Sequence, residues 1–110
     1  MTENNSHAGQ GSVLLDIGDD IGALVVMMPA ALEGFEIEVR PVGSHGPDEP
    51  HPVHVGVVGR PVDNRMHYSA VFGQLRQGGY EVYIRPDGPV RLSVSVAGGQ
   101  VSEANWPGVS

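Results

Sequence analysis

The chain of 110 residues carries 13 acidic and six basic side chains, a formal net charge of −7, and no cysteine. The length predicts one domain with room for a hydrophobic core, and the absence of cysteine excludes disulfides, thiolate-ligated zinc and a thiol nucleophile. The acidic balance argues against nucleic acid or an anionic membrane surface as a partner, because both require clustered lysine and arginine.

The first 11 residues, MTENNSHAGQG, are polar and contain neither lysine nor arginine. They lack the basic start and the apolar centre of a signal peptide. No run in the chain approaches the roughly 18 apolar residues of a membrane-spanning helix. We therefore expect a cytoplasmic protein with a disordered tail over residues 1–11 and a single folded domain over residues 12–107.

Glycines and prolines, 16 and nine in number, separate short apolar runs along the rest of the chain. This spacing is typical of all-β proteins. The strands expected in chain order cover residues 12–17, 21–28, 35–42, 53–60, 65–72, 80–85, 90–97 and 100–106. Together they predict a two-layer antiparallel β-sandwich of seven or eight strands with a Greek-key connection.

Two of these strands carry informative patterns. Residues 21–28 are almost entirely apolar, which predicts a central strand that is covered on both faces. Residues 35–42 alternate, and their polar face presents Glu36, Glu38 and Arg40. We interpret that face as solvated rather than as a binding strip.

Turn residues set the expected connections. Residues 61–64 predict a four-residue turn that would place Arg60 opposite Arg65, and the Asp-Gly pair at residues 87–88 predicts the turn of a second hairpin. The longest link, between Val42 and Val53, is the best candidate for a crossover between the two sheets.

Three segments resemble motifs of prealbumin-like (transthyretin-like, Cna-B-type) sandwich domains. Residues 32–39, LEGFEIEV, resemble an early G-x-x-V-x-V strand; residues 75–82, LRQGGYEV, resemble an L-x-x-G-x-Y-x-V corner; residues 90–101 resemble a closing v-x-V-x-x-G-x-v hairpin. The chain is also similar to short actinobacterial proteins without an assigned function. The resemblance implies a prealbumin-like fold over most of the chain after residue 11, and its motifs carry no chemistry of their own.

The segment HGPDEPHPVH, residues 45–54, combines three histidines, two carboxylates and three prolines. Imidazole and carboxylate are ligands that zinc, copper(II) or nickel accept, so one hypothesis is a single transition-metal ion bound here. The candidate ligands are His45, Asp48, Glu49, His51 and His54. The alternative is a proline-stiffened surface loop that needs no cofactor.

Strand geometry weakens the metal hypothesis. In the strand after this loop, Val53 and Val55 share one face, so His54 points to the other. His67, a possible third ligand, would pair with Val58 and lie about 13 Å from His54 at the rise of a strand.

A small hydrolase is a further alternative, because the transthyretin-like hydroxyisourate hydrolases show catalysis in a fold of this kind. Those enzymes end in Tyr-Arg-Gly-Ser, whereas this chain ends NWPGVS, so no catalytic residue carries over. The histidines of residues 45–54, or His67, would serve as the general base. The serines lack the G-x-S-x-G context of a nucleophile.

The aromatic side chains are few. Phe35, Phe72, Tyr80 and Tyr68 are expected in the core from their positions in the alternating strands. Tyr83 falls on the opposite face from its apolar neighbours and is expected to be exposed.

Trp106 stands beside a proline near the C-terminus. It predicts either a packing lid or an interface anchor. With Tyr83 it is a candidate interface residue.

No catalytic constellation emerges from the sequence, and an open sandwich leaves strand edges that must be covered or paired. The function that the sequence favours is therefore a non-enzymatic binding module for a protein partner or for another copy of the chain. The metal-binding protein and the small hydrolase remain the alternatives.

Overall fold

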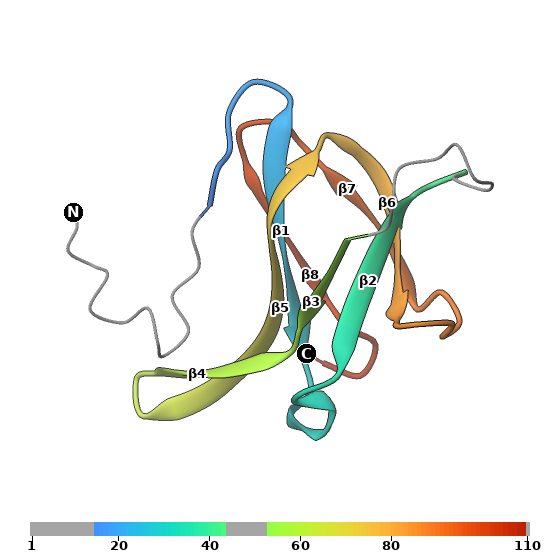
Figure 1. Cartoon of the computed structure of the whole chain (residues 1–110). Coiled ribbons are helices and arrows are strands. Elements are labelled where there is room, and N and C mark those ends of the chain that lie inside the picture. Colours follow the sequence, from blue (N-terminus) through green and yellow to red (C-terminus); the bar gives the residue numbers. More distant parts are fainter. Residues whose placement is uncertain (1–14, 44–52, 110) are drawn as a thin grey trace.

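The computed structural model describes residues 15–43 and 53–109, in which the chain forms two four-stranded sheets packed face to face (Figure 1). Sheet A has the order β4-β5-β1-β8 and sheet B the order β3-β2-β6-β7. The strands are β1 (Ile21–Met28), β2 (Glu36–Pro41), β3 (Val53–Gly56), β4 (Val58–Val62), β5 (Arg65–Arg76), β6 (Gly78–Ile84), β7 (Leu92–Val96) and β8 (Val101–Asn105). The all-β, two-layer sandwich predicted from the sequence is confirmed.

Sheet A is built around β1, which pairs antiparallel with β5 and parallel with β8. The predicted central position of Ile21–Met28 is therefore confirmed, whereas sheet B covers only one of its two faces. The strand expected over residues 12–17 is wrong for its described part: residues 15–17 form no strand, and the amide of Asp16 donates to the carbonyl of Gly73 at 3.2 Å. Residues 12–14 lie outside the described residues.

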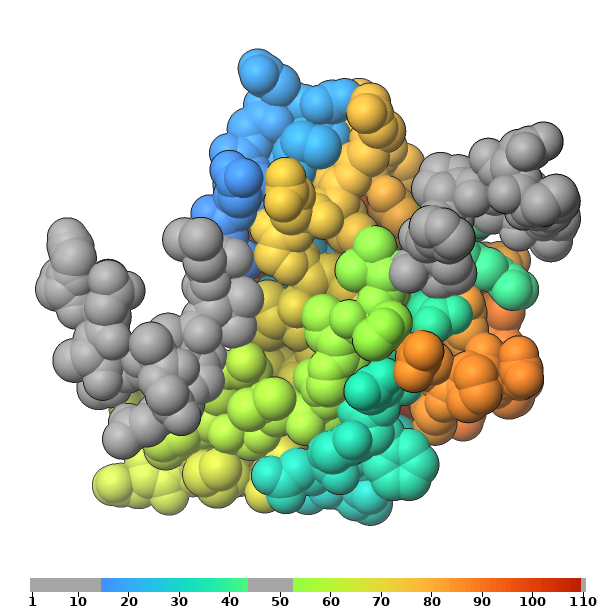
Figure 2. Space-filling view, viewed as in Figure 1, coloured from blue at the N-terminus to red at the C-terminus, as the bar shows by residue number. Residues whose placement is uncertain are grey.

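The chain changes sheets at Val57. Its amide donates to the carbonyl of Phe35 at 2.9 Å, and its carbonyl accepts from the amide of Gly34 at 3.0 Å. The single strand expected over residues 53–60 is thus two strands, β3 in sheet B and β4 in sheet A. In the space-filling view these two strands form one diagonal green band (Figure 2).

The link between Val42 and Val53 is not a crossover, contrary to expectation. It joins β2 and β3, which are antiparallel neighbours in sheet B with Val39 opposite Val53. Length alone suggested the crossover, but a long link can also return the chain to the adjacent strand. The sheet changes occur instead at short connections: the 3₁₀ turn η2 (Ala30–Leu32), Val57, Gln77 and the turn that precedes β8.

The connection from β5 to β6 is the tightest of these, because only Gln77 separates the two strands. Gly78 has φ +144°, a backbone conformation that side chains rarely adopt. The hydroxyl of Tyr80 donates to the carbonyl of Arg76 at 2.6 Å and so ties the two sides of the corner together. Both strands extend to this corner, further than the sequence pattern predicted.

The hairpin between β4 and β5 has a two-residue turn rather than the expected four-residue loop. Val62 lies opposite Arg65, and Asp63 and Asn64 have φ values of 52° and 66°. Two central residues with positive φ match the right-handed twist of paired strands, which favours this turn over a wider one. The predicted pairing of Arg60 with Arg65 is wrong by two residues.

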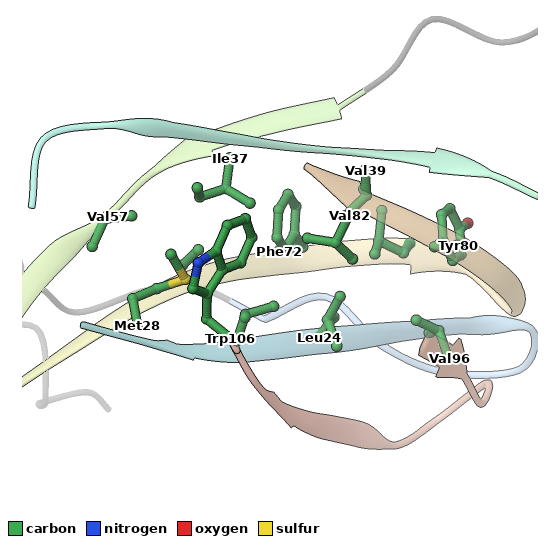
Figure 3. Packing of buried hydrophobic residues seen from close by; sticks show 13 residues of the cluster. Leu24, Met28, Ile37, Val39, Val57, Phe72, Tyr80, Val82, Val96 and Trp106 are labelled. Atoms are coloured by element: carbon green, nitrogen blue, oxygen red, sulfur yellow. The ribbon is translucent and has the colours of Figure 1, made fainter. Parts of the chain in front are cut away.

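The core lies between the sheets and includes Leu24, Val26, Ile37, Val39, Phe72, Val82 and Trp106 (Figure 3). Phe72 and Tyr80 are buried as predicted, and Tyr68 packs against the core from its edge. Phe35 corrects the prediction, because 48% of it is exposed. It precedes β2, and its amide bonds the carbonyl of Leu32 at 3.0 Å, so strand alternation does not turn it inward.

The described residues contain no helix that is both long and apolar enough to cross a membrane.

Candidate functional site

The outer face of sheet B carries a row of polar side chains that we call the charged ladder. Its members are His54 on β3, Glu36, Glu38 and Arg40 on β2, and Glu81, Tyr83 and Arg85 on or next to β6. These side chains lie on the outer face because side chains alternate between the two faces of a strand, and the residues between them on β2 and β6 point into the core. Register then puts Glu38 between His54 and Tyr83.

Glu38 is the centre of the ladder and is only 8% exposed. The hydroxyl of Tyr83 donates to its Oε2, and the Arg85 Nε lies 3.3 Å from its Oε1. Burial, together with the bond to the Glu38 carboxylate, raises the pKa of Tyr83 to about 12. A buried carboxylate needs such partners, since an unpaired charge away from water is costly.

The two ends of the ladder are more exposed. At one end the Arg40 Nε donates to the Glu81 Oε1 at 2.9 Å, and the guanidinium lies 5.0 Å from the centroid of the Tyr83 ring. The hydrogen bond to Glu81 raises the pKa of Arg40.

At the other end Glu36 accepts from the Arg85 Nη1 at 3.1 Å and lies 3.1 Å from the His54 Nδ1. Each charged or phenolic group of the ladder therefore has a partner within it. The face is arranged to hold its own geometry rather than to activate a nucleophile.

Of the five candidate metal ligands, His54 lies within the described residues. His45, Asp48, Glu49 and His51 lie outside the described residues. Within the described ranges 15–43 and 53–109, no group of three histidine or carboxylate side chains could hold a metal ion. His54, the one described candidate ligand, contacts Glu36 instead.

His67 and His54 do not belong to a common group of possible metal ligands among the described residues. Arg60 lies opposite His67 on sheet A, rather than the Val58 predicted from the sequence, whereas His54 belongs to sheet B. The two histidines are therefore on different sheets of the sandwich. A site that combines both is not supported.

The two aromatic interface candidates are both buried. Tyr83 is 4% exposed, which corrects the prediction of an exposed ring: Arg40 covers it and Glu38 binds its hydroxyl. Trp106 is 2% exposed and points between the sheets near Met28 and Ile37 (Figure 3). The guanidinium of Arg91 lies 5.4 Å from its ring centroid. Trp106 thus packs as a lid, the first of the two roles that its sequence position predicts.

A cavity of about 400 Å³ opens beside the β5–β6 corner. Apolar side chains that include Val39, Val42, Val53 and Leu75 line it together with Tyr80. Burial raises the pKa of Tyr80, and its hydroxyl is already bonded across the corner. The described lining therefore offers shape and apolar surface but no reactive group.

Sheet B ends at β7, an edge strand that the aromatic and histidine residues do not indicate. The carbonyl of Gly79 bonds Val42 on the β2 side, and the carbonyl of Val82 bonds Arg91 on the β7 side. The N–H and C=O groups of successive residues in a strand point to opposite neighbouring strands. The backbone groups of the even-numbered residues of β6 therefore point towards β7. Ser93 and Ser95 of β7, opposite odd-numbered residues, consequently turn their N–H and C=O groups away from the sheet.

The sequence did contain a signal for this edge. β7 reads Leu-Ser-Val-Ser-Val, an alternation of apolar residues and serine without a charge or a proline. Such a strand lacks the usual protection against pairing with another chain.

Comparison with known proteins identifies no family. No family model matches the chain, and no curated protein matches it. Among solved structures, a leucine-rich repeat protein from Bacteroides thetaiotaomicron aligns with 14% sequence identity and a TM-score of 0.45. The alignment covers 80% of this chain and 12% of that one.

Proposed function

We propose that this protein is a non-enzymatic binding module that recognises an extended segment of a protein partner, or of another copy of the chain, by adding a strand to sheet B at β7. The observation that carries the proposal is the outward-facing backbone of Ser93 and Ser95 on an uncharged edge. In strand addition, main-chain hydrogen bonds supply affinity and alternating side chains supply specificity.

The other three edges support β7 as the binding edge by contrast. β4 contains Pro61 and Arg60, β3 is only four residues long and carries His54, and β8 carries Glu103. Charges, proline and short length are the features that keep an edge from pairing. Among the described edges, β7 is the one without any of them.

Binding is favoured over hydrolysis because the charged and phenolic groups of the charged ladder are already paired with one another. The buried Glu38, the best candidate for a base, is held by Tyr83 and Arg85. A general base must be able to reach the proton it removes, and here both oxygens of the carboxylate have partners.

The metal-binding alternative stays a proposal, because most of its ligands lie outside the described residues. A prealbumin-like relationship also stays a proposal, resting on the three sequence motifs. Native mass spectrometry of protein isolated from its own host without a chelator tests the metal, since a bound ion adds its mass stoichiometrically. Loss of that mass on substitution of His51 and His54 by alanine would support the ligand assignment.

The test of the edge uses Ser95→Pro with Ser95→Ala as its matched control. Proline removes the outward-facing N–H that an added strand needs, while the amide ladder between β6 and β7 does not use that group. Alanine removes the hydroxyl but keeps the N–H. We expect strand addition at β7, by a partner segment or by another copy of the chain, to be lost in Ser95→Pro and retained in Ser95→Ala.

Hydrogen exchange on the associated species gives an independent reading. The amides of Ser93 and Ser95 are expected to exchange slowly in the complex and quickly in the free chain, since pairing protects them. Equal exchange rates in both states, or equal binding by the proline and alanine variants, would show that the edge is not used.

A further inference from the structure

The outer face of sheet A carries several apolar side chains where a solvent-facing sheet is usually polar. They lie among the polar residues Arg60, His67 and Ser69, and the Arg60 Nη1 donates to the Ser69 Oγ at 3.0 Å. Leu24, Val26 and Met28 point into the core, so Val25 and Met27 point outward from the same strand. Pairing puts further valines on this outward side. We call the set the apolar face: Val25, Met27, Val58, Val71 and Val101.

These side chains are accessible. Val58 is 39% exposed and Val101 is 43% exposed, while Val25, Met27 and Val71 are half-buried between them. The outer face of sheet B, in contrast, carries the charged ladder. An exposed apolar patch on one face of a protein commonly marks an interaction site.

The central position of β1 sharpens this contrast. Antiparallel sheets with one solvated face alternate apolar and polar residues, whereas a strand that is apolar on both faces is normally covered on both. β1 is apolar on both faces, and sheet B covers only one of them. Within residues 15–43 and 53–109, no second sheet covers its outward residues Val25 and Met27, which are half-buried.

Two exposed charges of opposite sign flank the apolar face. In the register of sheet A, Met27 lies opposite Ser69 of β5 and Asn105 of β8. Arg65 is four residues along β5 from Ser69. Glu103 is two residues along β8 from Asn105, in the opposite direction. At the rise of a strand these are displacements of about 13 Å and about 7 Å. Neither residue forms an ion pair with another described residue.

We propose that the apolar face is the interface of a symmetric dimer, with a second copy of this chain as its occupant. In this dimer the two-fold axis lies in the plane between the two faces and passes near Met27. Rotation about this axis brings the Arg65 of each copy next to the Glu103 of the other. The arrangement is isologous: one patch serves both subunits. Apolar side chains form most of its centre, together with Ser69 and the Arg60 that donates to it. The complementary charges lie towards its rim, as in protein interfaces generally.

The dimer uses a different surface from the β7 edge and does not depend on it. β7 belongs to sheet B, and the apolar face belongs to sheet A. A dimer built through sheet A keeps two β7 edges free, so the protein would present two copies of its binding strand. Ser95→Pro is accordingly expected to leave the dimer intact.

The experiment is a charge exchange, read by sedimentation equilibrium of the full chain at low ionic strength. Arg65→Glu and Glu103→Arg each place like charges opposite one another and are expected to weaken dimerisation about tenfold or more. The double variant, Arg65→Glu with Glu103→Arg, restores opposite charges and is expected to recover the dissociation constant of the wild-type chain. A general loss of folding would not be repaired by the second substitution.

Val58→Lys tests the apolar centre, with Val42→Lys as its control. Val42 is 59% exposed but directly follows β2 of sheet B, away from the apolar face, and its amide donates to the carbonyl of Gly79 on β6. We expect only the Val58 variant to be monomeric, with both variants retaining the buried Trp106 fluorescence.

A wild-type chain that stays monomeric at all concentrations would overturn the proposal. So would a dimer unaffected by the charge changes, or a stoichiometric complex in which a different protein, or residues 1–14 of the same chain, covers this face.

Discussion

Replacement of Tyr83 by phenylalanine should destabilise the fold although it removes a single oxygen atom. The hydroxyl donates to Glu38, which is 8% exposed and would lose one of its two partners. Hydrogen bonds to charged groups contribute about 1.5–3 kcal/mol. Because Arg85 still holds the carboxylate, we expect a loss near the middle of that range, about 2 kcal/mol.

Urea unfolding followed by the fluorescence of Trp106 measures this loss at pH 7. A decrease of about 2 kcal/mol corresponds to a midpoint lower by roughly 1 M for a domain of this size. Tyr68→Phe is the matched control, because Tyr68 is half-buried and its hydroxyl has no bond with the described residues. The control variant should stay within about 0.5 kcal/mol of the wild-type chain.

The pH dependence provides a second test of the same bond. The pKa of Tyr83 is raised to about 12 in the folded chain, above the value of about 10 for an unperturbed tyrosine. The stability that this raised pKa contributes is complete below pH 10 and is lost as the pH rises towards 12, because the tyrosine loses its proton at a lower pH in the unfolded chain. Tyr83→Phe should therefore reduce the loss of stability at alkaline pH. A smaller loss should remain, because the pKa of Tyr80 is also raised.

The reasoning would be refuted by a Tyr83→Phe variant that matches Tyr68→Phe in stability and shows the full wild-type loss between about pH 10 and pH 12. A double-mutant cycle with Glu38→Gln separates the bond from other effects. The two substitutions should be clearly non-additive, because they remove the same interaction.

Three further predictions concern the fold. Gly22→Ala should cost at least 1–3 kcal/mol, because a Cβ at this position would lie 2.2 Å from the carbonyl oxygen of Ala97; Gly56→Ala, with no atom within 4 Å, should unfold at nearly the wild-type urea concentration. Trp106→Ala should cost about 3–5 kcal/mol by opening the core, as measured by thermal unfolding with circular dichroism; a loss below 1 kcal/mol would contradict its assignment as a packing lid. Asn64→Gly should stabilise the β4–β5 turn by a few tenths of a kcal/mol and Asn64→Val should destabilise it by about 1 kcal/mol or more, since φ is 66° here; the reverse order of melting temperatures would argue against this turn.

Much of the sandwich could be predicted because strand patterns are local. Alternation in Glu36–Pro41 and the apolar run of Ile21–Met28 each depend on a few neighbouring residues, and both strands formed where expected. The second hairpin also followed from its turn residues, with Tyr80 opposite Val94. Local chemistry decides such features before any distant contact is made.

Partner strands were harder to predict, because two strands of similar pattern can pair with several others. The pairing of β1 with β8 in parallel, and the change of sheet at Val57, depend on how the two layers pack. The sequence assigned the longest link to a crossover, whereas the structure places the crossovers at short connections such as Gln77. Chain length between strands does not determine which sheet the next strand joins.

The same distinction applies to the two candidate surfaces, the β7 edge and the apolar face. The sequence alone determined that one strand is apolar on both faces and that another, Leu92–Val96, has no charge. Only the tertiary structure decided that the first turns Val25 and Met27 outward and that the second lies at an edge. It also buried Tyr83, because the ring lies between Arg40 and a carboxylate from a neighbouring strand. The sequence pattern of a strand determines which residues share a face. How exposed that face is depends on what the rest of the chain packs against it.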